Sequence, residues 1–357
     1  MELMAGLLPT PEQGELRGLI RSIVNDHVDG RRDAIAAGAD TSAWRALVDD
    51  VGVGGLAVPE EHGGSGMGWA EVSVAFEETG AGLLPVPVLP TSLAVAALLQ
   101  AAGSGSQDDL LRQVAAGTRR AVPVLALGPD ATCLAGAEDG RIELRRASII
   151  EPQDVDVLLV PVETADGALL YALDAAVASI EPTDTVDLTR PMALVTLDGV
   201  NAEPLGAVDV HWMHDLGRFL VAAEQVGGAR ACLDMAVTWA KERRQFDRPI
   251  GSFQSIKHQL ADAFVNVEAA SAALAEAARL VAAGGLEFAA AAAVAKSMAG
   301  DAFHDNAELS IHVHGGIGFT WEHDAHLYYR RALATNALFG HPRWLDRAVG
   351  AQLAAPR

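Results

Sequence analysis

A short, tight break between two long helical runs constrains this chain more than any other feature. One amphipathic run covers residues 215–242 and a second covers 252–280, and Pro249 and Gly251 interrupt the helical pattern between them. The second half of the chain is therefore predicted to fold as long helices that meet at a corner.

This corner also concentrates positive charge in an acidic chain. Its four cations are Lys241, Arg243, Arg244 and Arg248, whereas the 357 residues together carry a net charge of -21. A local cluster of cations in such an acidic chain indicates that an anion binds there, and phosphate-bearing cofactors are the usual small anions. Arg243 and Phe246 are three residues apart and are predicted to share one face at the end of the first helix, with Gln254 in the first turn of the next. An arginine, an aromatic ring and an amide suit a diphosphate beside a flat ring system.

Three ordered motifs carry a family resemblance over most of the chain. The corner reads Arg243-Arg-Gln-Phe246, Pro249-Ile250, Phe253-Gln254 and Leu260-Ala261-Asp262. About sixty residues later comes His314-Gly-Gly-Ile-Gly-Phe-Thr-Trp-Glu-His-Asp324. Near the start, Gly55-Leu-Ala-Val-Pro-Glu-Glu-His-Gly-Gly-Ser-Gly66 precedes Glu77-Glu78-Thr79-Gly80. In these motifs the chain resembles the acyl-CoA dehydrogenase family.

Apolar periodicity divides the chain into three parts. Residues 1–118 show helical spacing, and residues 119–208 contain short valine-rich runs bounded by Gly, Asp and Pro, which predict strands. Residues 209–357 return to helical spacing, with helices expected at about 211–242, 252–283, 286–313 and 323–352. We therefore expect an α+β, mostly α protein with an N-terminal helical domain, a small central β domain and a C-terminal four-helix bundle. The resemblance implies the same architecture.

Composition excludes several classes of partner. No apolar run reaches the ~18–20 residues that span a bilayer, and the segment around Glu2 does not have the pattern of a signal peptide. The acidic balance argues against nucleic acid and anionic membranes as partners. Cys133 and Cys232 are too few and too far apart for a disulfide framework or a metal site. A cytoplasmic location is expected.

The resemblance implies that FAD is the cofactor, and it assigns FAD binding to Arg243, Phe246, Gln254, His312, Gly315 and Gly316. The corner would hold the pyrophosphate and adenosine part of an FAD that a neighbouring subunit brings. Gly315 and Gly316 would allow close backbone approach to the ribityl and diphosphate groups. His312 stands where many family members have glutamine, and both side chains donate hydrogen bonds. Without the resemblance, Arg243 could be a surface cation at a helix end and the glycines an ordinary helix stop.

The chain offers no convincing catalytic base. Family members remove the α-proton of an acyl-CoA thioester with a carboxylate while the β-hydrogen leaves as hydride to the flavin N5. One family position for this carboxylate holds Phe339 here and the other holds Gly217. Asp215 faces elsewhere, roughly 200° around the helix from Gly217, and Glu224 lies two turns, ~10 Å, along the same face. No residue is assigned as catalytic.

The central region also departs from the family. A Thr-Glu-Pro-x-x-Gly-Ser-Asp loop, which contacts the flavin ring and the thioester, corresponds here to Val124-Leu-Ala-Leu-Gly-Pro-Asp-Ala-Thr132. The half that grips the flavin ring has lost the family pattern, while the half that grips a neighbour's FAD tail keeps it. This asymmetry resembles one subunit of the heteromeric α2β2 acyl-CoA dehydrogenases of actinobacteria, several of which act on CoA thioesters of steroid side chains.

We therefore expect a subunit of an FAD-dependent acyl-CoA dehydrogenase that completes the FAD site of a second such subunit. Its other partners would be an acyl-CoA substrate and an electron-transfer acceptor. Two alternatives remain open. One is a homo-oligomeric enzyme with an unrecognised base such as Glu224, and the other is a non-catalytic acyl-CoA-binding or scaffold protein on the same fold.

Overall fold

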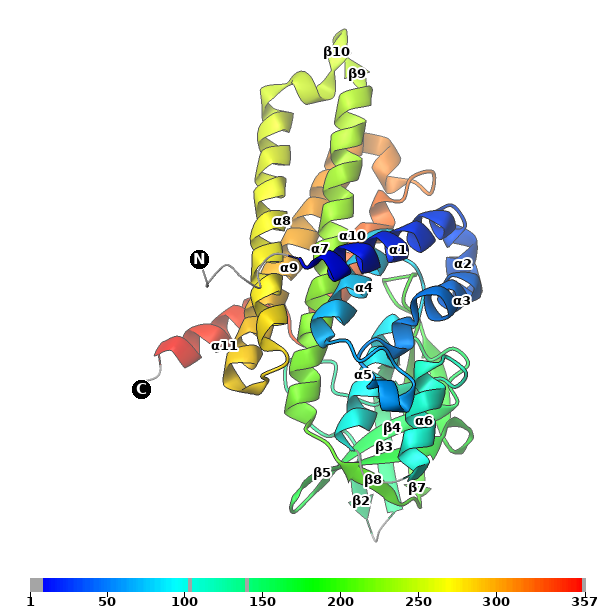
Figure 1. Cartoon of the computed structure of the whole chain (residues 1–357). Helices are drawn as coiled ribbons and strands as arrows, with labels where there is room; N and C mark the ends of the chain where they lie inside the picture. Colours follow the sequence, from blue (N-terminus) through cyan, green and yellow to red (C-terminus); the bar gives the residue numbers. More distant parts are fainter. Residues whose placement is uncertain (1–8, 102–104, 139–140, 355–357) are drawn as a thin grey trace.

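The computed structural model describes residues 9–101, 105–138 and 141–354 (Figure 1). Six helices come first: α1 (Pro11–Val28), α2 (Arg31–Ala37), α3 (Thr41–Ala46), α4 (Trp69–Gly82), α5 (Val88–Gln100) and α6 (Gly105–Ala115). A π-helical turn, η2 (Leu47–Val51), and two short 3-10 turns lie between α3 and α4. The expected helical character of this part is confirmed, with glycine- and proline-rich segments separating the helices.

Strands occupy the central part. They are β1 (Ala121–Pro123), β2 (Gly136–Glu138), β3 (Arg141–Ile150), β4 (Val157–Thr164), β5 (Gly167–Asp174), β6 (Ser179–Thr183), β7 (Met192–Val200) and β8 (Pro204–Ala207). They form two four-stranded sheets, in the orders β1-β4-β5-β8 and β2-β3-β7-β6. Among the strands of the described residues, β1 and β4 pair in parallel and the other neighbours in the two sheets pair antiparallel. Alternate residues of β7, such as Val195 and Leu197, point into an apolar core between the two sheets. Leu158 and Val160 of β4 enter this core from the other sheet.

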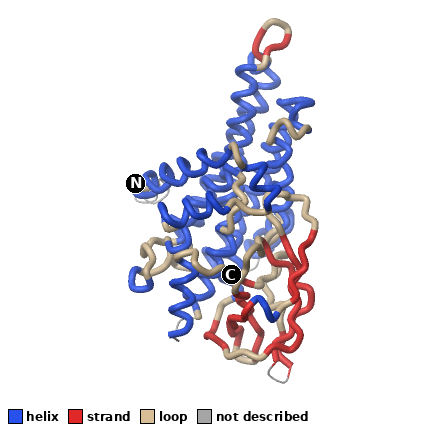
Figure 2. The backbone as a smooth tube through the Cα atoms, turned by 90° about the vertical axis from the view of Figure 1, so that its right-hand side faces the viewer, coloured by secondary structure: helices blue, strands red, loops and turns tan. Residues whose placement is uncertain are grey.

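Long helices follow and form the second half of the molecule. They are α7 (Val210–Glu242), α8 (Gln254–Leu280), α9 (Gly285–His314), α10 (Ala325–Ala337) and α11 (Pro342–Ala354). Figures 1 and 2 show α7 and α8 side by side as a pillar that projects beyond the other helices, with the strands at the opposite end. The mostly α, α+β fold with a small β region is thus as expected. Among the described residues, no helix is both long and apolar enough to cross a lipid bilayer.

One expected helix is wrong. The predicted helix 323–352 is two helices, because the chain turns sharply between α10 and α11. Phe339 and Gly340 have φ values of 56° and 114°, in the left-handed region that a continuing helix cannot use. Pro342 then opens α11 at a position where its missing N–H costs nothing.

A buried ionic network joins the β region to the helices. Glu224 on α7 receives Arg190 Nη2 at 2.8 Å from the segment before β7 and Arg331 Nη1 at 2.6 Å from α10. Arg190 Nε also lies 2.8 Å from Glu151 Oε1, and Arg331 Nε lies 2.6 Å from Asp187 Oδ2. All five residues are at most 5% exposed. Buried charges are tolerated only when they are paired in this way, so each member depends on the others.

We expect Glu224→Gln to destabilise the fold strongly. The substitution keeps the side-chain shape but leaves Arg190 and Arg331 buried with less negative charge, which typically costs about 3 kcal/mol. Thermal unfolding of the purified chain measures the loss. Glu268→Gln is the control, because its 3.7 Å pair with Arg230 is exposed and such pairs contribute under about 1 kcal/mol. Equal melting temperatures for the two variants would contradict this role.

The same network predicts how stability depends on pH. Burial opposes ionisation of Glu224, but the attraction of Arg190 and Arg331 outweighs it and lowers the pKa from 4.5 to about 2. A carboxyl whose pKa is lower in the folded state stabilises the fold above its unfolded value, and this stability is lost as the pH falls through the folded value. Between pH 5 and pH 3, wild type should therefore lose more free energy of unfolding than Glu224→Gln. Parallel losses would show that Glu224 does not carry the acid sensitivity.

Candidate functional site

The corner between α7 and α8 is a tight hairpin at the tip of the pillar. Arg244–Gln245 (β9) pairs with Arg248–Pro249 (β10), and the turn residues Phe246 and Asp247 have φ values of 51° and 62°. The prediction that Arg243 and Phe246 share a helix face is wrong, because α7 ends at Glu242 and Arg243 is already extended. A two-residue reversal with both φ angles positive is the turn that matches the twist of a hairpin. Gln254 opens α8, as expected.

The cations of this tip have no counter-carboxylate. In the part of the chain that the structure describes, none of the ion pairs involves Lys241, Arg243, Arg244 or Arg248. The guanidinium of Arg243 lies 6.0 Å from the ring of Trp239, and that of Arg248 lies 4.1 Å from the ring of Phe253. Arg244 donates to the backbone oxygen of Asp247 at 2.6 Å. The three arginines are held by rings and backbone, so their charge stays available to an anion.

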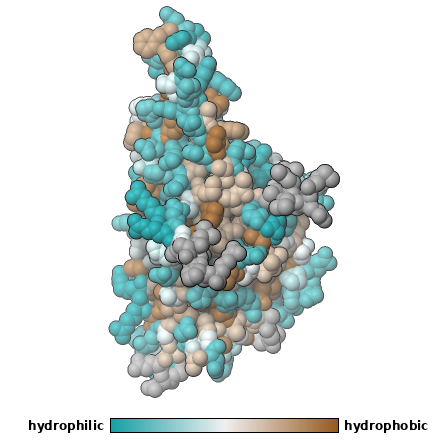
Figure 3. Space-filling view, turned by 90° about the vertical axis from the view of Figure 1, so that its left-hand side faces the viewer, coloured by the Kyte–Doolittle hydropathy of each residue, from teal (hydrophilic) through white to brown (hydrophobic). Residues whose placement is uncertain are grey.

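Phe246 is unusually exposed for a large apolar side chain. It is 86% exposed, and its only aromatic neighbour among the described residues is Phe253, at a ring distance of 6.1 Å. The surrounding pillar surface is largely hydrophilic (Figure 3). A core role for this ring is therefore excluded, and a ring in this position is suited to contact another molecule.

The glycine loop follows α9. Its 3-10 turn, η7 (Gly315–Phe319), begins with Gly315 at φ 68°, a conformation that favours glycine. Gly316 differs, because its φ is ordinary and a Cβ built there would meet nothing within 4 Å. The fold of this chain thus gives no reason for glycine at 316, whereas close approach of another molecule would. His312 lies exposed on the last turn of α9, beside this loop.

Trp239 connects the tip to the loop. Its indole lies below Arg243 and packs on the ring of His314 at a centroid distance of 5.0 Å. Arg243 is therefore near the start of the glycine loop, while Phe246 and Gln254 belong to the tip. The sequence analysis did not identify Trp239, although it stands four residues before Arg243 and so faces the same side of the chain.

The two family positions for a catalytic base lie against each other. A Cβ built on Gly217 would stand 2.8 Å from Cζ of Phe339, so the phenyl ring occupies the space above the glycine. This ring is fully buried and packs edge-on against His214 at 5.2 Å. The space between these two positions is thus filled by hydrocarbon.

The loop after β1 is bound to the same place by its backbone. Phe339 N–H donates to the oxygen of Leu127 at 2.7 Å, and the ring nitrogen Nε2 of His214 lies 2.8 Å from the oxygen of Gly128. Arg218 donates from Nη2 to the oxygen of Pro129 and from Nε to the oxygen of Phe339, at 2.8 and 2.9 Å. Three successive carbonyls of the loop are occupied by groups of this chain. This is the segment that the sequence analysis matched to the flavin-contacting loop of the family.

Glu224 does not serve as an alternative base. Both its oxygens are engaged by arginines, and only a cavity of about 10 Å³ remains beside it. Its pKa is lowered to about 2, burial being outweighed by Arg190 and Arg331. A general base works best when its pKa lies near the operating pH. These contacts argue against Glu224 as the unrecognised base of a homo-oligomeric enzyme.

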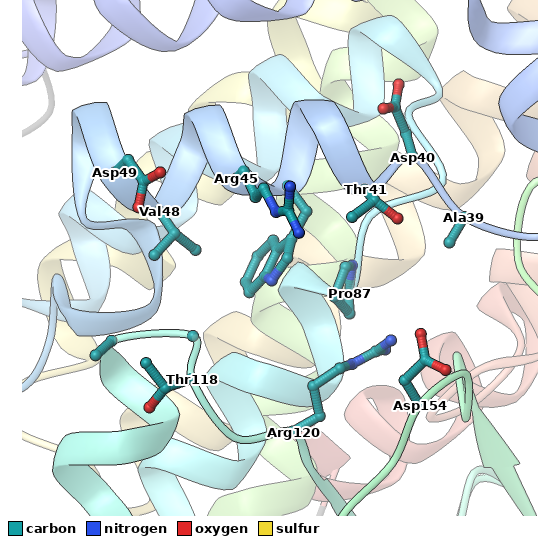
Figure 4. Close-up of a pocket in the computed structure, with 13 residues that line it drawn as sticks. Ala39, Asp40, Thr41, Arg45, Val48, Asp49, Pro87, Thr118, Arg120 and Asp154 are labelled. Atoms are coloured by element: carbon teal, nitrogen blue, oxygen red, sulfur yellow. The ribbon is translucent and has the colours of Figure 1, made fainter.

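A separate hollow of about 360 Å³ lies where the N-terminal helices meet the β region (Figure 4). Arg45 and Arg120 reach into it from opposite walls. Trp44 also lines it. The carboxylates of Asp40, Asp49 and Asp154 line it as well. Its lining thus carries three acidic and two basic side chains, unlike the cationic tip of the pillar.

Comparison with known proteins identifies two matching family models. The model described as "Acyl-CoA dehydrogenase, N-terminal domain" matches residues 10–118, and the model described as "Acyl-CoA dehydrogenase, C-terminal domain" matches residues 206–352. The chain is 33% identical over 346 residues to the acyl-CoA dehydrogenase IpdE2 of Mycolicibacterium smegmatis, covering 96% of this chain and 99% of that protein. The IpdE2 of Mycobacterium tuberculosis is 35% identical over 351 residues, covering 97% and 99%.

Solved structures agree. A variant of the Tcur3481–Tcur3483 steroid ACAD superposes with a TM-score of 0.86 at 32% identity, covering 96% of this chain and 98% of the other. The ChsE4–ChsE5 complex from Mycobacterium tuberculosis gives a TM-score of 0.88 at 28% identity, covering 98% and 99%. FAD is the cofactor of the proteins in this family. The two domain models, the overall likeness to IpdE2 and these shared folds establish that the chain belongs to the acyl-CoA dehydrogenase family of flavin-dependent oxidoreductases.

Proposed function

We propose that this chain is the non-catalytic subunit of a heteromeric acyl-CoA dehydrogenase and completes the FAD site of a catalytic partner. One observation carries the proposal: the FAD corner is open and cationic, whereas both base positions are sealed in apolar contact. An enzyme that worked alone would need both halves in a functional form. Similarity to the ChsE4–ChsE5 complex and to the two-chain Tcur3481–Tcur3483 protein supports a second subunit.

The residues of the corner fit the tail of FAD. Arg243 supplies a cation without a carboxylate partner, which suits a diphosphate oxygen through a charge-assisted hydrogen bond. The exposed ring of Phe246 offers apolar contact area, and Gln254 and His312 offer hydrogen bonds to the adenosine part. Gly315 and Gly316 leave the backbone open to close approach. In this assignment, FAD supplies the hydride acceptor for α,β-desaturation, and the residues of this chain bind and orient its tail.

The remaining chemistry belongs to the partner. It would contribute the carboxylate that removes the α-proton and the pocket for the flavin ring and acyl-CoA, since Phe339 fills the corresponding place here. We propose a CoA thioester of a steroid side chain as the first substrate to test. The support is the 32% identity to a protein described as a steroid ACAD. The scaffold alternative has the same sealed base positions in its favour, and flavin binding separates the two.

The first test is Arg243→Ala in the assembled enzyme. Loss of a charge-assisted contact to phosphate costs about 1.5–3 kcal/mol, so FAD affinity should fall by roughly 10- to 100-fold. Equilibrium dialysis of flavin measures the change, and the melting temperature of the chain should stay constant because Arg243 makes no ion pair. Arg248→Ala is the matched control on the same hairpin, where the guanidinium already stacks on Phe253. Unchanged flavin affinity in Arg243→Ala would make Arg243 a surface cation.

A second test concerns the chain alone. Purified without a partner, it should contain little flavin and should not dehydrogenate acyl-CoA thioesters, because the loop at Leu127–Pro129 and the ring of Phe339 close its own site. Co-expressed with the acyl-CoA dehydrogenase chain encoded beside it, it should form a complex with one FAD per pair of unlike chains. Absorbance at the flavin maximum against protein mass gives this ratio. A yellow, active preparation of the single chain would refute the proposal.

A further inference from the structure

The glycine loop Gly315–Phe319 depends on contacts made by the residues that flank it. We propose that Arg31 and His323 are positioning residues that hold the loop Gly315–Phe319 in place for the FAD tail of the partner. The inference rests on the proposed function and extends it, because it gives the N-terminal helices a part in a cofactor site formed by the C-terminal half. We call the six residues Arg31, Arg32, Asp324, Trp239, His314 and His323 the loop clamp.

The loop has little support of its own. Gly315, Gly316, Phe319 and Thr320 are exposed, and Phe319 is 77% exposed. Within the turn, the Thr320 N–H and hydroxyl both donate to the oxygen of Ile317, at 3.0 and 2.9 Å. Such local bonds shape the turn but do not fix its place on the protein. One internal contact helps, because Gly318 is buried against the last turn of α9, where a Cβ would stand 3.0 Å from the oxygen of Ile311. The exposed residues of the loop depend on its two ends.

The N-terminal helices hold the C-terminal end of the loop. Arg31, the first residue of α2, is 2% exposed and forms an ion pair with Asp324, the residue just before α10. The same guanidinium donates to the backbone oxygen of Gly82 and lies 3.3 Å from the hydroxyl of Tyr328. Arg32 donates from Nε to Asp324 Oδ1 at 2.9 Å and also bonds the backbone oxygen of Trp321. Two arginines therefore converge on one carboxylate directly behind the loop.

Because Arg31 is buried, its pairing with Asp324 fixes the position of that carboxylate. A fully buried arginine is costly unless its charge is compensated, so Arg31 draws Asp324 to one place. Burial opposes ionisation of Asp324, yet the attraction of Arg31 and the hydrogen bonds from both arginines outweigh it, and the pKa of the carboxyl lies below its ordinary value. The pair thus stays charged at neutral pH.

A stack of aromatic rings holds the N-terminal end of the loop, at His314. The rings of His314 and His323 lie 4.0 Å apart, and Trp239 packs on His314 at 5.0 Å and near His323 at 6.5 Å. His323 Nδ1 also accepts the N–H of Ala325 at 3.1 Å. The residue before the loop and a residue after it are therefore stacked on each other and on the end of α7. Arg243 lies over the other part of this stack, so the clamp and the FAD corner are continuous.

The experiment uses the complex with its catalytic partner. Arg31→Lys removes one hydrogen-bonding arm and Asp324→Asn removes the charge. His323→Ala takes one ring out of the stack and leaves the buried arginine in place. Each should weaken FAD affinity roughly tenfold, the equivalent of about one hydrogen bond. Hydrogen exchange at residues 315–320 of the flavin-free complex should become faster, while KM for the acyl-CoA stays constant because the substrate pocket lies in the partner.

Arg17→Lys is the matched control. Like Arg31, Arg17 on α1 is paired with carboxylates, in its case those of Glu77 and Glu78. Among the described residues it has no contact with the loop. It should alter the melting temperature without altering flavin affinity or exchange at 315–320. The inference is overturned if the clamp variants bind FAD as wild type does, or if they lose flavin only in proportion to their loss of assembly.

Arg243→Ala separates this inference from the proposed function. If Arg243→Ala leaves FAD affinity unchanged, the corner does not bind the FAD tail and both ideas fail. If Arg243→Ala weakens FAD binding and the three clamp variants do not, the corner binds FAD but the loop needs no clamp. Weakened binding in both sets, with faster exchange only in the clamp variants, is the expected result.

Discussion

The ion pairs of Glu224 with Arg190 and Arg331 hold together three parts of the chain that are distant in sequence. Glu224 comes from the central helix α7, Arg331 from α10 and Arg190 from the segment that enters β7. Because all three are almost completely buried, none can lose its partner without leaving an uncompensated charge. The β region is thereby fixed against the helices. The same pairing that makes Glu224 structurally necessary removes it from acid–base chemistry, since a carboxylate held by two arginines is a poor proton acceptor.

Closure of the former base position is equally well supported by hydrogen bonds. The backbone of Phe339, the side chain of Arg218 and the ring of His214 satisfy three neighbouring carbonyls of the loop after β1. To admit a flavin ring, the chain would have to break these bonds and expose a buried phenyl group. Such a change costs both hydrogen bonds and apolar burial. The closed site is therefore a stable state of this fold and not a vacant pocket awaiting a ligand.

The sequence predicted the parts that depend on local pattern. Helix order, the strand-rich centre, the start of α8 at Gln254 and the family itself follow from periodicity and motifs. The turn at Phe246 was mistaken for helix because arginine and glutamine continue a helical pattern until the reversal must occur. The break at Phe339 was missed although Gly340 and Pro342 are local helix-break signals in the sequence. Contacts such as Arg31 with Asp324, 293 residues apart, or Gly217 with Phe339, leave no trace in spacing, because only the folded chain brings them together.

One helix links the closed place to the open corner. The 33-residue α7 is about 50 Å long, and it begins beside the sealed loop, carries Gly217 and Glu224 in its first half, and ends at Trp239 and Arg243. A rod of this length transmits its orientation along its whole axis. The contacts around Arg218 and the buried ionic network therefore fix the first half of α7, and α7 in turn sets the position of the cationic tip. Under the proposed function, these packing contacts at the base of α7 fix where Arg243 stands relative to the FAD of a partner.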